Sequence, residues 1–189
     1  MQLAVAAPDL FDRCLAGEAR AWRELHGTYY PVARRFLRRL GVDEASTEDA
    51  CQEVFVQIFR SLGEFEGRAD FKTWLYGLCV THAARSRRKA SVLSALRRAT
   101  SMFRGGDHVP GTGLHAVGAE AQEIVRSALR KVKPIYTVPL VLFELEGLSG
   151  QEIAEILGCP VATVWRRLHE ARKQLQRLVE PDGEEGQHD

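Results

Sequence analysis

The amino-acid sequence predicts an all-α protein built from two small helical domains joined by a flexible linker. Three observations lead to this prediction. Apolar residues recur at three- and four-residue steps over residues 10–89, the pattern fails over a Gly- and Pro-rich stretch, and it resumes from residue 119. With 189 residues, 45% of them hydrophobic, the chain is long enough to bury a core but short for more than two compact domains.

The first helical segment is expected over residues 10–40. Gly17 should divide it into two helices and Gly41 should end the second one, because glycine readily takes the left-handed conformation that follows many helices. The apolar residues at helical spacing are Leu10, Phe11, Leu15, Trp22, Leu25, Tyr29, Val32, Phe36 and Leu40.

The next helix is expected from about residue 46 to Leu62. Ser46 or Thr47 can cap it by accepting a hydrogen bond from a backbone N–H of its first turn. The expected buried stripe comprises Val54, Phe55, Ile58, Phe59 and Leu62, and the opposite face presents Asp49, Gln52, Glu53, Val56 and Arg60. This polar face is either solvated surface or a docking face for a basic partner helix.

A charged, Gly-rich loop at residues 63–70 leads into a third amphipathic helix that begins at Phe71 and ends in the basic residues 87–89. Phe71 and Trp74 fit the core of the protein best. Phe65, on the loop, and Tyr76, off the apolar stripe, are expected to be exposed. Aromatic rings beside positive charge suit unpaired nucleic-acid bases, because each stacked base contributes about 1–3 kcal/mol.

A linker is expected over residues 91–118, because the stretch FRGGDHVPGTG is rich in Gly and Pro. Helical periodicity then resumes and is expected to be interrupted at Lys133 and Pro134. The apolar run at residues 138–145 lies in helical surroundings and is predicted to be a helix. Pro139 fits that helix only in its first turn, since proline deeper in a helix removes a hydrogen bond.

A helix-turn-helix is predicted over residues 147–175. Ser149 is placed to cap a short helix, with Glu152 three residues later as in a capping box. Gly158 can take the left-handed conformation that ends this helix, and Pro160 suits the entry to the next. The second helix should bury Val161, Val164, Leu168, Ala171, Leu175 and Leu178 and present Ala162, Trp165, Arg166, His169, Glu170 and Lys173. A basic helix of this size can enter a DNA major groove.

Basic side chains are concentrated in two stretches, although the whole chain is nearly neutral, with 26 Lys and Arg against 25 Asp and Glu. The stretches are residues 71–104 and 165–177, and each ends an apolar-periodic segment. This placement favours a polyanionic partner over two merely solvated faces.

Several classes of protein are disfavoured. The chain has no run of about 18 apolar residues and no basic N-terminal region of a secretory signal, so we expect a cytoplasmic protein without membrane insertion. The four cysteines stand far apart without a CxxC and the six histidines are scattered, so no metal, cofactor or disulfide framework is expected. No HExxH, GxSxG or P-loop motif occurs, and no catalytic residue is expected.

Two stretches resemble a known family, the bacterial RNA polymerase sigma factors of the extracytoplasmic-function (ECF) group in the sigma-70 superfamily. Residues 46–78, STEDACQEVFVQIFRSLGEFEGRADFKTWLYGL, are similar to the second conserved region of that family. Residues 146–175, EGLSGQEIAEILGCPVATVWRRLHEARKQL, are similar to its fourth region. The resemblance extends from about Leu10 to Val179.

The resemblance implies two separate helical modules and a function in transcription initiation. Residues 8–90 would form a domain that docks on core polymerase and melts the minus-ten element, and residues 91–118 the linker. Residues 119–180 would form the helix-turn-helix domain that reads the minus-thirty-five element, followed by an acidic tail at 181–189. The implied partners are core RNA polymerase, through its clamp helices and flap, promoter DNA, and an anti-sigma factor.

The resemblance also assigns residues to these functions. Docking on the polymerase core would use Asp49, Gln52 and Glu53. The minus-ten candidates are Phe65, Arg68, Lys72, Tyr76, Thr81, Arg87 and Arg88. The minus-thirty-five candidates are Trp165, Arg166, His169, Arg172 and Lys173.

Six residues depart from those common in the family: Thr81, Arg85, Thr137, Pro139, Trp165 and Glu170. They bear on which promoter is recognised more than on the class of activity. The alternative hypothesis is a stand-alone helix-turn-helix transcriptional regulator. Such a protein would bind its operator alone and would not depend on Asp49 or Glu53.

Overall fold

The computed structural model describes residues 8–101, 127–129 and 131–179. These residues form helices and the turns and loops between them, with no strand among them, as the all-α prediction requires. Most of the expected linker, residues 102–118, and the acidic tail, residues 181–189, lie outside the described residues.

The N-terminal domain is built from four α-helices and one short 3₁₀ helix: α1 (Pro8–Leu15), α2 (Ala19–Arg39), α3 (Glu44–Ser61), η1 (Leu62–Glu64) and α4 (Phe71–Ser101). Gly17 and Gly41 both adopt a φ of +83°, which confirms that glycine ends α1 and α2. Helix α4 continues to Ser101. Residues 91–101, which were predicted to belong to the linker, are therefore helical.

The start of α3 differs from its prediction. Asp43 is the N-cap, and its carboxylate accepts a hydrogen bond from the backbone N–H of Ser46 at 2.8 Å. The Thr47 side chain is buried inside the first turns, where its hydroxyl donates to the Asp43 carbonyl at 2.6 Å. The prediction of Ser46 or Thr47 as the cap is therefore wrong, because the aspartate just upstream already accepts from a backbone N–H of the first turn.

The C-terminal domain comprises α6 (Pro134–Leu140), a π-helical turn η2 (Val141–Leu145), α7 (Gly150–Leu157) and α8 (Val161–Val179). Residues 127–129 and 131 are helical and the helical pattern breaks at residues 132–133, so the expected interruption at Lys133 and Pro134 is confirmed. The next helix, α6, begins there, with Lys133 at its N-cap position and Pro134 as its first residue. Pro139 is buried inside α6, not in its first turn as expected. Proline has no backbone N–H to donate. Shortly after it, in η2, the backbone hydrogen bonds change from the α spacing of four residues to the π spacing of five, and the Glu146 N–H donates to the Val141 carbonyl at 3.1 Å.

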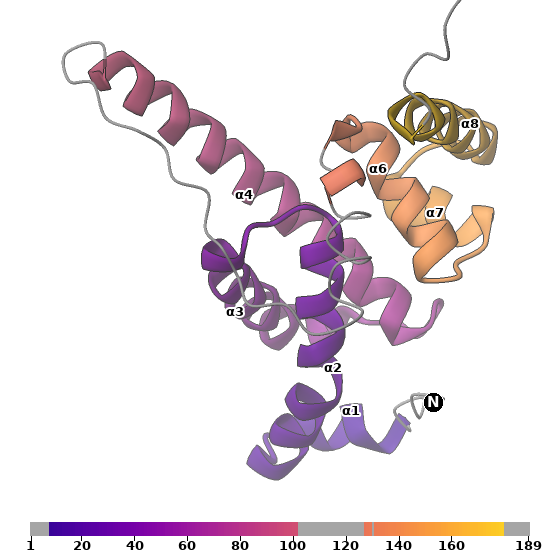
Figure 1. Ribbon diagram of the computed structural model, residues 1–189. Coiled ribbons are helices and arrows are strands. Elements are labelled where there is room, and N and C mark those ends of the chain that lie inside the picture. Colours follow the sequence, from indigo (N-terminus) through magenta and orange to yellow (C-terminus); the bar gives the residue numbers. More distant parts are fainter. Residues whose placement is uncertain (1–7, 102–126, 130, 180–189) are drawn as a thin grey trace, which may run out of the picture.

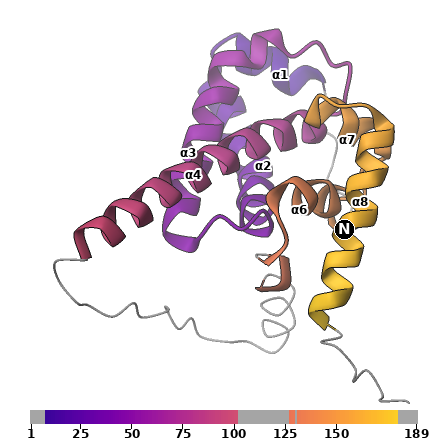
Figure 2. The ribbon, with the colours of Figure 1, turned by 90° about the horizontal axis from the view of Figure 1, so that it is seen from above.

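The turn between α7 and α8 matches the prediction. The Ser149 hydroxyl accepts from the Glu152 N–H, and the Glu152 carboxylate accepts from the Ser149 N–H at 2.8 Å, which completes the capping box. Gly158 takes the left-handed conformation with φ +58° and ends α7. The last residues of α8 extend past the body of the domain (Figure 2), and Leu178 is 40% exposed there rather than buried as expected.

Removing the Ser149 hydroxyl should destabilise the protein at neutral pH and matter less in acid. Hydrogen bonds from the Ser149 backbone and then its side chain hold the pKa of Glu152 below its ordinary value of 4.5. Stabilisation from a lowered carboxylate pKa is complete above the unfolded-state value and is lost as the pH falls through the folded-state value. Ser149→Ala should therefore lower the free energy of unfolding by about 0.5–2 kcal/mol at pH 7 in urea titrations. The difference should shrink below about pH 4, and an undiminished difference there would contradict this account.

The two domains are in contact, contrary to the expectation of separate modules. Their buried side chains form one continuous cluster that runs from Leu10 in α1 to Ala171 in α8. Helices α4 and α7 contact each other across the two domains, and α7 lies beside the N-terminal part of α4 in both views (Figures 1 and 2).

Candidate nucleic-acid and protein interfaces

The outer face of α8 carries the basic side chains predicted to read duplex DNA. Arg166, His169 and Lys173 are exposed. The opposite face is fixed in the core by Val164, Leu168 and Ala171, which are each fully buried. Because one face of α8 is packed, the basic face has a fixed orientation toward solvent, as a groove-binding helix requires.

Trp165 and Arg172 on the same face are anchored on the ring of Phe143. The Trp165 indole meets this ring edge-on at a centroid distance of 5.4 Å, and the Arg172 guanidinium lies 5.8 Å from its centroid. Arg172 also donates to Glu144 Oε1 at 2.6 and 3.2 Å. A Cβ at Gly150 would lie 2.8 Å from the indole, so glycine there allows the ring to pack on α7. Both side chains are thus held in place while Trp165 stays 47% exposed.

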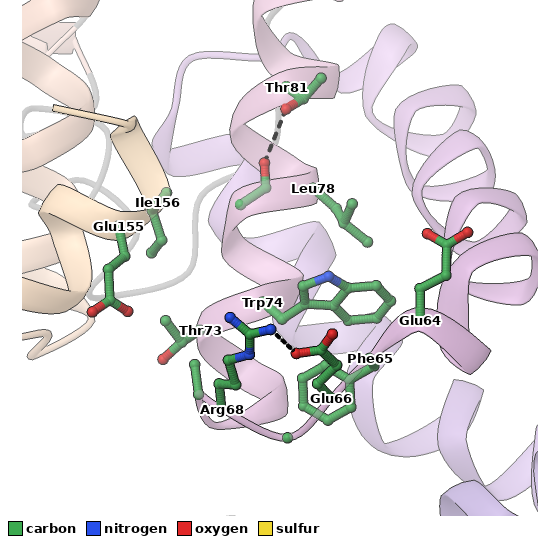
Figure 3. Close-up of a pocket in the computed structure, with 13 residues that line it drawn as sticks. Glu64, Phe65, Glu66, Arg68, Thr73, Trp74, Leu78, Thr81, Glu155 and Ile156 are labelled. Atoms are coloured by element: carbon green, nitrogen blue, oxygen red, sulfur yellow. Dashed lines mark hydrogen bonds and ion pairs between the residues drawn. The ribbon is translucent and has the colours of Figure 1, made fainter.

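A cavity of about 420 Å³ lies where the loop before α4 meets one face of that helix. Figure 3 shows the Trp74 indole in its centre, between Phe65 on the loop and Leu78 on α4. Of the residues predicted to contact the opened strand, Phe65, Arg68 and Thr81 line this cavity. Glu155 and Ile156 of α7 border it from the other domain (Figure 3).

The aromatic rings that line the cavity belong to a larger cluster of packed aromatic side chains. Phe65 packs edge-on against Phe11 at 5.7 Å and Phe71 at 5.5 Å, and it lies 5.2 Å from the Trp74 ring. Phe65 is therefore half-buried rather than freely exposed. Phe71 is core, as expected, whereas Trp74 is half-buried and faces the cavity.

The remaining residues predicted to contact the opened strand do not line the cavity. Tyr76 was expected to be exposed, and this expectation is wrong, because its side chain is fully buried against Phe36 at a centroid distance of 4.4 Å. The Lys72 ammonium lies over the Tyr76 ring, 5.5 Å from its centroid. Arg87 donates to the Leu40 carbonyl at 3.1 Å, and burial lowers its pKa. Arg88, like Arg68 and Thr81, is exposed.

The acidic face predicted for protein docking lies on α3. Asp49, Gln52 and Glu53 are all exposed. Glu53 also reaches toward α4, where its carboxylate lies 3.1 Å from the buried His82 ring nitrogen and 3.2 Å from the Lys89 ammonium. These two contacts, the one to His82 first, lower the pKa of Glu53 and keep it ionised.

Two apolar residues extend this face. Val56 and Phe59 are 48% and 67% exposed, and they continue the stripe of Asp49 and Gln52 along α3. Phe59 was assigned to the buried stripe, which is wrong; its ring lies on Trp22 at 5.0 Å, outside the core. The signal that could have revealed it is its position seven residues after Gln52, close to two helical turns along the same face.

No helix within the described ranges is long and apolar enough to cross a membrane. In the same part of the chain, no three or more His, Cys, Asp or Glu side chains gather in a way that could hold a metal ion.

Two protein-family models match the chain. The model "Sigma-70 region 2" matches residues 25–92, and the model "Sigma-70, region 4" matches residues 122–175. The first match covers most of the residues that line the aromatic cavity and the acidic face of α3, and the second covers the helix-turn-helix.

Full-length relatives are also similar. The ECF RNA polymerase sigma-E factor of Haemophilus influenzae is 31% identical over 185 residues, which cover 91% of this chain and 94% of that protein. The RNA polymerase sigma-H factor of Pseudomonas aeruginosa is 29% identical over 181 residues, covering 91% of this chain and 93% of that protein.

Solved structures share the fold. CnrH, in complex with the cytosolic domain of CnrY, gives a TM-score of 0.67 at 22% identity, over 93% of this chain and 97% of that one. The sigma factor RpoE of Bartonella quintana, crystallised with the anti-sigma factor NepR, gives a TM-score of 0.62 at 20% identity, over 87% and 100%.

Proposed function

The chain belongs to the ECF group of sigma-70 RNA polymerase sigma factors, and on this premise we propose how its domains share the work of promoter-specific transcription initiation. Core RNA polymerase and promoter DNA are its partners. An anti-sigma factor is proposed as a third, because the similar RpoE structure contains one. The chain acts in the bacterial cytoplasm, where polymerase and chromosome lie, and has no catalytic activity of its own.

The cavity beside Trp74 holds a base flipped out of the minus-ten element. A flipped base needs an aromatic surface for stacking and polar groups for its edge. Trp74 and Phe65 provide the surface, and the Thr81 hydroxyl can accept a hydrogen bond while it donates to the Gly77 carbonyl. Arg68, whose side chain is 84% exposed, can leave its ion pair with Glu66 for a phosphate.

The other basic residues of α4 hold the opened strand by its backbone. Lys72 and Arg88 can contact phosphates, and Arg87 can do so only by giving up its bond to the Leu40 carbonyl. Tyr76 has no part in this proposal, since its ring is fully buried.

The outer face of α8 reads the minus-thirty-five element as duplex DNA. Arg166 suits the paired acceptors of a guanine edge in the major groove, and His169 and Trp165 can contact bases or thymine methyl groups. Lys173 and Arg172 are placed one to two turns further along α8 for phosphates or bases. The chain needs no strong affinity for DNA by itself, because polymerase holds it on the promoter. Its near-neutral net charge agrees with this.

The face of α3 that carries Asp49, Gln52 and Glu53 docks on the clamp helices of core polymerase. Val56 and Phe59 continue this face as an apolar stripe. An acidic rim beside exposed apolar residues is a common composition of a protein–protein interface.

The observation that carries the proposal is the presence in one chain of a helix-turn-helix with an outward basic face and of an aromatic cavity flanked by Arg68 and Thr81. The test is reconstitution: the purified chain, mixed with core polymerase of its own bacterium and genomic promoter fragments, should give transcripts that start at defined promoters. A complex that forms but starts at no promoter would contradict it. Tight operator binding without polymerase, unaffected by changes at Asp49, would favour the stand-alone regulator.

The Arg166→Ala variant should lose discrimination at a single base pair of the minus-thirty-five element. The expected loss is about 1–3 kcal/mol, because a bidentate arginine–guanine contact carries that much discrimination. Transcription from a promoter library randomised in this element measures it. Arg177→Ala, in the last turn of the same helix, is the matched control. An equal loss across all sequences would instead identify Arg166 as a phosphate contact.

A further inference from the structure

The Trp165 indole packs directly against Gly150 at the start of α7. A Cβ added to Gly150 would lie 2.8 Å from Trp165 Cζ2 and 3.1 Å from Cε2, and Cβ atoms in proteins essentially never lie closer than 3.0 Å to another heavy atom. Gly150 itself is buried. The indole therefore occupies the space that any side chain at position 150 would need.

The backbone gives no other reason for glycine at this position. Gly150 is the first residue of α7, and it is not among the described glycines that adopt a positive φ. Alanine is the better helix former, so helix propensity does not favour glycine either. The space taken by the Trp165 ring thus explains the glycine.

Phe143 in η2 closes a second side of the space around the indole. Its ring meets the indole edge-on, with the ring centroids 5.4 Å apart and the ring planes at 77°. The backbone that carries Trp165 is fixed as well, because Val164 and Leu168 are fully buried. We call Gly150 and Phe143 the indole seat. With both its backbone and its ring held, Trp165 has few rotamers open to it, although it is 47% exposed.

The exposed part of the indole lies among the side chains proposed to read duplex DNA. Arg166 is its neighbour in the chain, His169 follows one helical turn later, and both are exposed. These two side chains can form hydrogen bonds to base edges, whereas the carbon rim of an indole is apolar. In the major groove, the apolar group that distinguishes one base from the others is the C5-methyl of thymine.

We propose that the indole seat fixes Trp165 so that it recognises the C5-methyl group of one thymine in the minus-thirty-five element. Trp165 is then a specificity-determining residue, and Gly150 and Phe143 are positioning residues that act through it. The inference rests on the proposed function, because it concerns the promoter sequence that α8 reads.

The experiment replaces each thymidine of the minus-thirty-five element in turn, on either strand, by deoxyuridine, which lacks only the C5-methyl group. The template is the promoter that the wild-type chain with core polymerase transcribes most strongly from the randomised library. At promoter concentrations well below saturation, the wild type should lose about four-fold in transcription at one thymidine, the contribution of one buried methyl-sized group. The other replacements should have smaller effects.

The Gly150→Ala variant should lose this dependence on the methyl group, because the new Cβ displaces the indole. Phe143→Leu should weaken the dependence in the same way by opening the other side of the seat. It adds no atom to α7, so it remains informative if the alanine variant folds poorly, which circular dichroism establishes. Gly27→Ala is the matched control, since Gly27 is a helical glycine of α2 whose added Cβ would meet nothing within 4 Å. It should respond as the wild type does.

A double-mutant comparison separates positioning of the indole from a general effect on folding. Trp165→Ala should itself ignore the methyl group, and adding Gly150→Ala to it should change transcription by less than about two-fold, because the Cβ then meets no indole. An equal loss from Gly150→Ala with and without the indole would overturn the indole seat, as would a Gly150→Ala variant that keeps the full wild-type response.

Two outcomes for the wild type distinguish this inference from the proposed function. A wild type that transcribes from its promoters but tolerates every deoxyuridine would overturn thymine recognition by Trp165 and leave the proposed function intact. A wild type that gives no promoter-dependent transcription with core polymerase would overturn the proposed function, and the recognition of thymine with it.

Discussion

Replacing Asp49 with arginine is expected to abolish binding to core polymerase while leaving the fold unchanged. Asp49 is exposed on α3, so the new side chain creates no steric conflict in the core. A like-charge contact at an interface costs several kcal/mol, and about 3 kcal/mol corresponds to roughly a 100-fold loss of affinity. Fluorescence anisotropy with labelled chain and core polymerase measures this loss directly.

Asp12→Arg is the control for this prediction. Asp12 is also an exposed aspartate, but it lies on α1, so the variant carries the same change in net charge at a different site. We expect it to bind core polymerase as the wild type does. Equal affinities of Asp49→Arg and Asp12→Arg would remove Asp49 from the docking face.

The Leu168→Ala variant is expected to lose about 2–5 kcal/mol of unfolding free energy, the usual cost of truncating a fully buried leucine. Leu168 is completely buried where α8 packs on α6 and α7. A domain has a total free energy of unfolding of about 5–15 kcal/mol, so the loss is a large share of it. Because Leu168 anchors α8, the variant should also hold the basic face of α8 in a less fixed orientation. Urea denaturation followed by circular dichroism measures it.

Leu178→Ala makes the same chemical change ten residues later on the same helix. Leu178 is 40% exposed, and we expect a loss within about 0.5 kcal/mol. Similar losses in the two variants would mean that α8 is not anchored through Leu168.

The helix-turn-helix was readable in the sequence because its signals are local. The capping box of Ser149 and Glu152 and the left-handed Gly158 lie within ten residues of one another, and each was confirmed in place. The apolar spacing of α8 identified Val164, Leu168 and Ala171 as buried, and left Arg166 and His169 on the exposed face. Such signals depend on neighbours in the chain and need no knowledge of distant contacts.

Predictions failed where a distant segment decided the environment of a side chain. Tyr76 lies off the apolar stripe of α4, yet it is buried because α2 and the Glu146 segment of the other domain cover it. Phe59 fits the apolar spacing of α3, yet it is 67% exposed, and its ring lies 5.0 Å from the Trp22 ring outside the core. Periodicity gives the direction of a side chain on a helix, but not which neighbour lies there.

By itself the sequence determined the helices, the capped turn, the basic face of α8 and the family to which the chain belongs, since these follow from short-range periodicity and contiguous motifs. The tertiary structure alone decided that the two domains touch, that Glu146 is buried between Arg39 and Tyr76, and that α7 borders the aromatic cavity. The physical reason is sequence separation: these contacts join residues 70 or more positions apart, and only the packing of the folded chain brings them together.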